Sequence, residues 1–392
     1  MIPGLSQLGL LLFVSALVAI LTRRLRLPYT VGLVLAGMTL SFLHVRLQLH
    51  LSKDLIFSIF LPPLVFEAAL CIHWREFKGD LPVVAVLATL GVLVAAAVTA
   101  GGMHYALDWD WGSAIIFGVL IAATDPVSVI ATFKEAGVQG RLRLLIESES
   151  LLNDGTAAVG FVAVLSVLAG EHYNAVSIVG ELLLTMGGGL LIGAAVAFGF
   201  MHLAGRTSDY LVEITLTTLA AYGSFFVAEH YGFSGVLAAL AAGLVVGNYG
   251  PSGSISESGR HALETFWEFV AFIANSLIFI LIGAQEAQQH FIGLWLPVLV
   301  AIALVTLGRA VAIYPLCALF ARSRLRIESR HQHILFWGGL RGALALALSL
   351  SLPEDLPHHD AIITITFAVV AFSVFAQGLT ITPLLRRLGQ LK

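Results

Sequence analysis

The chain has 392 residues, of which 58% are hydrophobic and only 11% are charged, and its formal net charge is -3. A soluble globular domain carries about 25% charged residues, so this chain lacks the polar surface that a water-soluble fold needs. The charge deficit predicts a protein that contacts the lipid bilayer, and the lack of a basic excess predicts no nucleic-acid partner.

The apolar runs predict an all-α polytopic membrane protein. The first run precedes its positive charges, Arg23 and Arg24, whereas a secretory signal peptide has the reverse order, so we expect a retained membrane helix. A spanning helix needs roughly 20 mainly apolar residues, and this criterion gives about 13 spans. Their approximate limits are 4–22, 28–44, 53–72, 81–103, 112–133, 145–170, 176–203, 210–229, 233–249, 263–283, 291–320, 332–352 and 360–385.

The basic residues predict the orientation of these spans. If the N-terminus lies outside, 17 of the 21 Lys and Arg residues fall in cytoplasmic loops, two (Arg46 and Lys53) fall in outer loops, and two (Arg309 and Arg341) fall within spans. Cytoplasmic loops collect Lys and Arg. We therefore expect a multi-pass inner-membrane protein with a cytoplasmic C-terminus. No long polar stretch separates the spans, so we expect one transmembrane unit over 1–392 without a soluble regulatory domain.

The fifth span carries an aspartate where charge is costly and usually functional. Asp125 is followed by Pro126, and proline removes a backbone donor and pushes the preceding residue out of the α region. The helix is therefore expected to unwind around Thr124-Asp125-Pro126. Unwound backbone in a bilayer is tolerated along a protein-lined cavity, where its carbonyls can coordinate a cation. The alternative is a simple proline kink with a solvated aspartate.

The twelfth span is expected to break as well. Gly338, Gly339 and Gly342 surround Arg341 at its centre, and glycine permits a break or a close helix approach. The fifth and twelfth spans run in opposite directions. Two interrupted spans of opposite direction predict an inverted-repeat transporter fold with two broken, crossing helices.

The segment 147–159 concentrates polar side chains at the start of a span. Ser150 and Asp154 are four residues apart, as are Glu149 and Asn153, so each pair shares a helix face. Burial disfavours the charged form of a carboxylate, which suits Asp154 to carry protons. A capping cluster at a helix N-terminus is the alternative for Glu147 and the neighbouring serine.

Two further charges within the spans need partners. Glu149 and Arg341 are expected to form a buried ion pair, because a lone charge of either kind is hard to keep in the interior. Glu67, after Pro62-Pro63 in the third span, faces the same problem. Arg309 has a structural alternative: it can reach the membrane surface or form a purely structural pair.

At these residues the chain resembles the monovalent cation:proton antiporters. The resemblance rests on Thr124-Asp125-Pro126, on ESLLNDG at 149–155, on GGLRGALALAL at 338–348, and on FEAAL in the third span. These motifs occur in the family's order and the likeness runs over essentially the whole chain. The Asn153-Asp154 pair is similar to the NhaP-like branch, which also contains the eukaryotic sodium/proton exchangers.

The resemblance implies a homodimer that works by alternating access. It implies a core domain at about 81–170 and 263–385, less a linker helix, and dimerisation helices at about 1–50 and 176–249. Asp154 would carry the cation and the proton, and Glu149 and Arg341 would form a structural ion pair. The cation ligands that it implies are Asp154, Asp125, Ser150, Thr124 and Glu67, with Asn153 and Pro126 in supporting positions.

The function predicted is exchange of Na⁺ or Li⁺ for H⁺. The electrogenic branch has a second aspartate where this chain has Asn153, so one titrating carboxylate predicts electroneutral 1:1 exchange. The ions are substrates and no cofactor is expected. A K⁺/H⁺ antiporter of the same fold is the alternative. A channel or an intramembrane hydrolase is disfavoured, because the sequence contains no filter loop, zinc motif or paired catalytic aspartates, and we expect no enzymatic activity.

Overall fold

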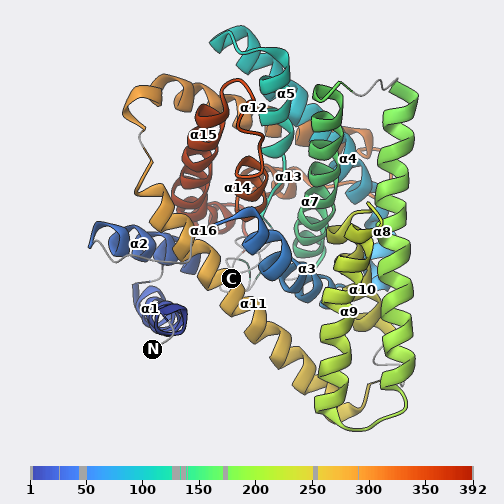
Figure 1. The fold of residues 1–392 in the computed structure, drawn as a ribbon. Helices are drawn as coiled ribbons and strands as arrows, with labels where there is room; N and C mark the ends of the chain where they lie inside the picture. Colours follow the sequence, from blue (N-terminus) through green and yellow to red (C-terminus); the bar gives the residue numbers. More distant parts are fainter. Residues whose placement is uncertain are drawn as a thin grey trace.

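The computed structural model describes residues 3–25, 27–43, 51–125, 133, 138, 140–170, 175–249, 255–289 and 291–390. Within these ranges every regular element is a helix (Figure 1). The all-α prediction is therefore confirmed. Pro126, which was predicted to unwind the fifth span, lies outside the described residues.

Most helices of the first half of the chain follow the predicted spans, whereas the helix that begins at Trp111 ends at Leu120, well within the predicted span 112–133. The helices of this half are α1 (Pro3–Leu25), α2 (Tyr29–Phe42), the π-helix η1 (Leu55–Phe60), α3 (Leu61–Leu70), α4 (Trp74–Leu107), α5 (Trp111–Leu120), α7 (Arg141–Leu168) and α8 (Ala175–Ala204). Helix α4 begins earlier than the 81–103 expected from hydropathy. Its polar first turns are fixed because Arg141 donates to both carboxylate oxygens of Asp80, at 2.7 to 3.0 Å.

The second half contains α9 (Tyr210–His230), α10 (Gly235–Tyr249), α11 (Glu257–Glu286), η3 (Ile292–Leu294), α12 (Trp295–Leu319), α13 (Ser329–Trp337), α14 (Ala343–Ser349), α15 (His359–Phe372), the π-helix η4 (Ser373–Gln377) and α16 (Gly378–Arg387). Helix α11 starts before the predicted 263 because the Ser256 hydroxyl caps it, accepting from the Gly259 N–H at 3.0 Å. Helix α12 is continuous.

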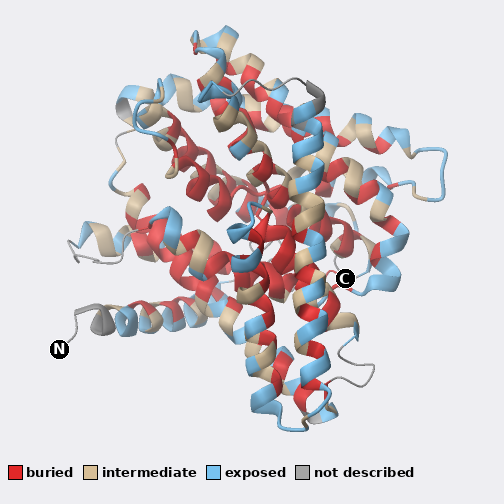
Figure 2. Ribbon diagram, turned by 45° about the vertical axis from the view of Figure 1, so that its right-hand side comes forward, coloured by how far each residue is buried: buried red, intermediate tan, exposed pale blue. Residues whose placement is uncertain are grey.

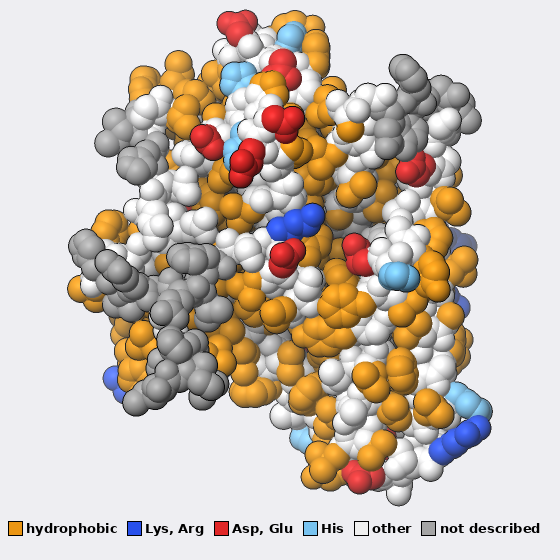
Figure 3. Space-filling model, viewed as in Figure 1, with side chains coloured by type: hydrophobic (Ala, Val, Ile, Leu, Met, Phe, Trp, Pro, Cys, Tyr) orange, Lys and Arg blue, Asp and Glu red, His pale blue; other side chains and the backbone are white. Residues whose placement is uncertain are grey.

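Among the described residues, eight helical stretches are long and apolar enough to cross a membrane. The helices α2 and α10, the η1–α3 segment and α5 are apolar but shorter. The polytopic character is confirmed, whereas the number of about 13 spans stays a prediction. The buried residues gather in the middle of the molecule (Figure 2), and hydrophobic side chains cover much of the face in Figure 3, where acidic side chains gather in the upper part.

Two groups of helices and a long diagonal helix make up much of the fold. Helices α4, α5, α7 and α12 pack together, and α8, α9 and α10 form the second group (Figure 1). Helix α11 crosses the molecule diagonally, from beside α2 to the lower end of α9, and packs against both (Figure 1). At Gly283 a Cβ atom would lie 2.1 Å from the Val34 carbonyl oxygen, so only glycine allows α11 to approach α2 this closely. The division into core and dimerisation domains stays a prediction.

Candidate functional site

Two interrupted segments meet in the interior. Helix α5 ends at Leu120 and the chain is not helical at 123–125, while 338–342 separates α13 from α14. The Asp125 N–H donates to the Leu340 carbonyl at 2.7 Å. A Cβ on Gly342 would lie 2.5 Å from the Asp125 Cβ, so a glycine is needed where the segments cross. The predicted break in the twelfth span is confirmed. Asp125 is 8% exposed, so the alternative of a solvated aspartate is wrong.

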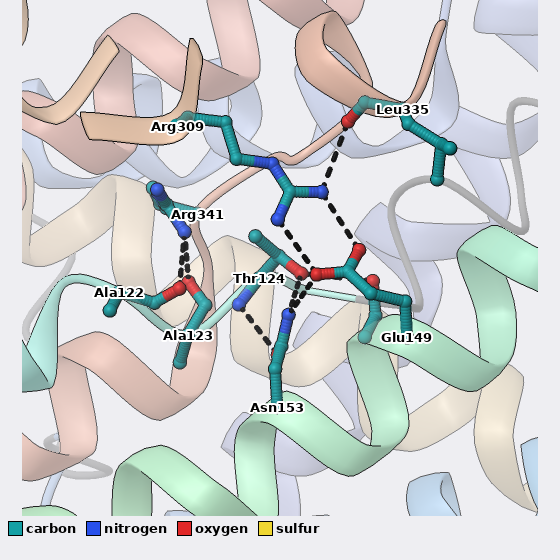
Figure 4. Close-up of polar contacts among 9 residues, drawn as sticks. Ala122, Ala123, Thr124, Glu149, Asn153, Arg309, Leu335 and Arg341 are labelled. Carbon is teal, nitrogen blue, oxygen red and sulfur yellow. Dashed lines mark hydrogen bonds and ion pairs between the residues drawn. The ribbon is translucent and has the colours of Figure 1, made fainter. Parts of the chain in front are cut away.

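Arg341 stabilises the unwound backbone of the fifth span. Its guanidinium donates to the carbonyls of Ala122 and Ala123 at 2.7 and 2.8 Å (Figure 4). Its own N–H donates to the Ser373 hydroxyl at 2.8 Å, and that hydroxyl donates to Gln377 at 2.6 Å within η4. Two carbonyls freed by the unwinding are therefore used by an arginine.

The prediction that Glu149 pairs with Arg341 is wrong, because the partner of Glu149 is Arg309. The carboxylate of Glu149, 1% exposed, accepts two hydrogen bonds from Arg309, at 2.7 and 2.8 Å (Figure 4). Arg309 also donates to the Leu335 carbonyl at 3.0 Å. The physical reason is that Arg341 lies in an unwound segment and satisfies backbone carbonyls. Arg309 lies on the continuous helix α12, and its guanidinium pairs with both oxygens of the carboxylate.

Asn153 connects this ion pair to the unwound segment. Its amide nitrogen donates to Glu149 at 2.9 Å and to the Thr124 hydroxyl at 2.6 Å. Its amide oxygen accepts from the Thr124 N–H at 3.1 Å. The hydroxyls of Thr124 and Ser150 are hydrogen bonded at 3.0 Å. Residues from α7 and α12 therefore hold the backbone directly before Asp125 in place.

The helix that carries these residues begins well before them. Helix α7 starts at Arg141, so Glu147 and Ser148 lie more than one turn inside it, and both are buried. The alternative of an N-terminal capping cluster is therefore wrong. Glu147 instead forms an ion pair with Arg143 on the same helix. The helix continues through Asp154 to Leu168, so Asp154 lies near its middle.

Asp154 faces a small cavity at the crossing. It is 3% exposed, and among the described residues nothing hydrogen bonds to its Oδ1 atom. The cavity, of about 20 Å³, is lined by Asp154, Asp125, Thr124 and Gly342, and by apolar residues of α3 and α14. This volume is enough for about one water-sized particle. Two carboxylates thus line one small cavity, which suits a monovalent cation stripped of most of its water.

Glu67 is placed differently from the other predicted ligands. It lies on α3, whose Leu61, Leu64 and Val65 line the cavity, but it is not among the lining residues. It is half-buried. The structure thus brings together five of the predicted site residues, Thr124, Asp125, Ser150, Asn153 and Asp154. The role of Glu67 as a cation ligand stays a prediction.

Sequence reasoning missed several residues that support this site. Ser373 and Gln377 gave only a weak signal, two polar side chains four residues apart in an apolar span. The carbonyls of Ala122, Ala123 and Leu335 gave no side-chain signal at all. Arg309 did give a signal, because it is one of two arginines within the spans.

Solved structures share this fold over nearly the whole chain. The sodium proton antiporter MjNhaP1 from Methanocaldococcus jannaschii at pH 8 superposes with a TM-score of 0.76 at 20% sequence identity, covering 99% of this chain and 97% of that one. An electron-microscopy map of the same antiporter gives a TM-score of 0.79, also at 20% identity, with 100% and 99% covered. The predicted antiporter fold is confirmed.

Sequence comparisons identify the family. The chain is 37% identical over 366 residues to the Na⁺/H⁺ antiporter ApNhaP of Aphanothece halophytica, covering 93% of this chain and 70% of that protein. It is 33% identical over 396 residues to the Na⁺/H⁺ antiporter NhaH of Halobacillus aidingensis, covering 98% and 97%. The family described as "Sodium/hydrogen exchanger, transmembrane" matches residues 10–387. The resemblance seen in the motifs is confirmed, and the chain belongs to the sodium/hydrogen exchanger family.

Proposed function

We propose that this protein exchanges Na⁺ or Li⁺ for H⁺ across the membrane, with Asp154 binding the cation and the proton in turn. The observation that carries the proposal is the buried carboxylate of Asp154, whose Oδ1 atom has no hydrogen-bond partner among the residues that the structure describes and which shares a small cavity with Asp125. Its relatives named as Na⁺/H⁺ antiporters support the choice of ions.

The burial of Asp154 couples the two ions. A carboxylate taken out of water is strongly disfavoured unless a proton neutralises it or a cation pairs with it. Asp154 would therefore change its exposure between the two sides of the membrane only when it holds one of the two. This requirement converts two opposite movements into an obligatory exchange. The movement itself would be alternating access, with both ions as substrates and no resident cofactor.

The residues around Asp154 favour the exchange of one cation for one proton. Asn153 does not titrate, and it is hydrogen bonded to Glu149 and Thr124. Glu149 itself is neutralised by Arg309. Asp154 then trades a proton for a cation while Asp125, which lines the same cavity, stays a cation ligand, and this division favours electroneutral 1:1 exchange. Asp125, Ser150, the Thr124 backbone and Glu67 would complete the cation ligands at different stages.

We further propose a homodimer in the inner membrane, with the N-terminus outside and the C-terminus in the cytoplasm. Helix α8 supports the dimer, because only 17% of its most apolar stretch is buried within the chain. Its side chains Leu183 and Leu191 are 67% and 73% exposed. Such a face needs lipid or a second copy of the chain to cover it. The positions of Lys and Arg support the orientation.

The test is a scan of cations in proteoliposomes that hold a pH gradient reported by a quenched dye. Na⁺ and Li⁺ are expected to dissipate the gradient with saturable kinetics, whereas K⁺ and Ca²⁺ leave it unchanged. Dissipation by K⁺ but not Na⁺ would make the protein a K⁺/H⁺ antiporter. A flux that does not saturate with any cation would contradict exchange and favour a channel. Protein-free liposomes are the control.

A further inference from the structure

A second, larger cavity lies beside the candidate site. Its volume is about 410 Å³, and it separates η1, α7 and the end of α14 from α8, α9 and the turn into α10. Most of its wall is apolar, and the charged residues that line it are Lys53, Asp54, Glu181 and Glu229. These four side chains are exposed. In the proposed orientation the cavity lies on the side of the membrane away from the arginine-rich loops.

Three helical segments, α7, α14 and η1–α3, line both this larger cavity and the smaller cavity at Asp154. On α7 it is lined by Ala158, four residues after Asp154. On α14 it is lined by Leu348, four residues after Leu344, which lines the smaller cavity. Because four residues make about one helical turn, roughly one turn of each helix separates the two spaces. Asp154, which lines the smaller cavity, lies at the inner end of this path.

The third segment of the wall is the irregular one. Phe57 lines the larger cavity from the π-helix η1, and Leu61 lines the smaller cavity from the first turn of α3. The hydroxyl of Tyr222 on α9 donates to the Ile59 carbonyl of η1 at 2.9 Å. π-Helices are rare and occur frequently at functional sites. The wall between the two cavities therefore includes a π-helix.

The charges around this cavity are mainly negative. Asp54, Glu181 and Glu229 against Lys53 give a formal charge of -2. Glu229 is held in place because its carboxylate accepts the Gly235 N–H at 2.8 Å. The charge of Lys53 acts on Glu229. An excess of negative charge around an apolar-walled cavity focuses the field and raises the local concentration of cations.

We propose that this cavity is the vestibule through which cations reach Asp154 from the outer side, and that Glu229 sets the apparent cation affinity on that side while Lys53 opposes it. The inference rests on the proposed function and orientation. It assigns to Glu229 a role in attracting the hydrated cation, upstream of the carboxylate that exchanges it. Lys53 lowers the negative potential at the entrance, so the two residues have opposite effects.

The experiment compares the two sides of the membrane separately. Half-saturating Na⁺ concentrations are measured in right-side-out and in everted vesicles for wild type, Glu229→Gln, Lys53→Gln and Glu354→Gln. Glutamine keeps the acceptor for Gly235 and removes only the charge. Glu229→Gln is expected to raise the outer half-saturating concentration about threefold, and Lys53→Gln to lower it by a similar factor, since each changes the local potential. The cytoplasmic value stays the same.

Glu354 provides the matched control, because it is an exposed carboxylate of the loop between α14 and α15 that does not line the cavity. Raising the ionic strength with an inert salt is expected to shrink the difference between Glu229→Gln and wild type. An unchanged outer value in Glu229→Gln, or an equal change on both sides, overturns the vestibule while wild-type exchange leaves the proposed function intact. Absence of exchange by wild type overturns the proposed function and this inference with it.

Discussion

The Asp154→Asn variant is expected to fold like wild type and to lose cation–proton exchange completely. Asparagine has nearly the same shape as aspartate, so the small cavity at the crossing is preserved. Its amide cannot release a proton at any accessible pH and carries no charge to balance a cation. The initial rate of pH-gradient dissipation by Na⁺ in proteoliposomes measures the loss, and the melting temperature of the purified protein measures folding.

The control for this variant is Asp355→Asn, which removes an exposed carboxylate from the loop between α14 and α15. It is expected to exchange at the wild-type rate. Retention of substantial exchange by a well-folded Asp154→Asn protein would show that another group carries the proton. Asp125 shares the cavity and would be the first candidate.

The second large effect is on stability. Arg309→Ala would leave the carboxylate of Glu149, which is 1% exposed, without its ionic partner. Removing one partner of a buried ion pair typically costs about 3–5 kcal/mol, because the remaining charge is uncompensated. The variant is therefore expected to express poorly and to melt at a markedly lower temperature. Fluorescence-detected size exclusion after a temperature series measures this directly.

A double-mutant cycle distinguishes the two arginines. Combining Glu149→Gln with Arg309→Ala is expected to cost less than the sum of the single changes, because the double variant has no uncompensated charge. The same cycle with Arg341→Ala is expected to show a smaller coupling, since Arg341 donates to backbone carbonyls. A larger coupling between Glu149 and Arg341 would restore the pairing expected from the sequence.

Much of the architecture could be predicted from the sequence, because lipid imposes strict rules on it. Apolar runs must be about one membrane thickness long, so hydropathy located the helices. The break in the twelfth span followed from the glycines around Arg341, which favour neither a continuous helix nor a strand. The polar helix ends of α4 and α11 were missed, because they are fixed by tertiary contacts of Asp80 and by the Ser256 cap.

The candidate site could be predicted only in part. Residues four apart on α7 were placed on one face by helix geometry alone. The partner of Glu149 could not be chosen, because both arginines lie within spans and pairing depends on which helix crosses nearest. The sequence predicted a carboxylate partner for Arg341, whereas in the structure its guanidinium donates to backbone carbonyls of the unwound segment. Backbone acceptors become visible only when the broken segment is placed in space.

If Asp154 alone trades a proton for a cation, each cycle moves no net charge, and the stoichiometry of exchange tests this most directly. Na⁺/H⁺ exchange is measured in proteoliposomes with a membrane potential imposed by K⁺ and valinomycin, once the cation scan has shown that K⁺ is not transported. A net charge moved per cycle would gain or lose about 2.3 kcal/mol per 100 mV. Electroneutral 1:1 exchange predicts the same rate and end point at either sign of the potential. A clear acceleration or reversal by the potential would contradict it, and Asp125 or Glu67 would then be the second proton carrier.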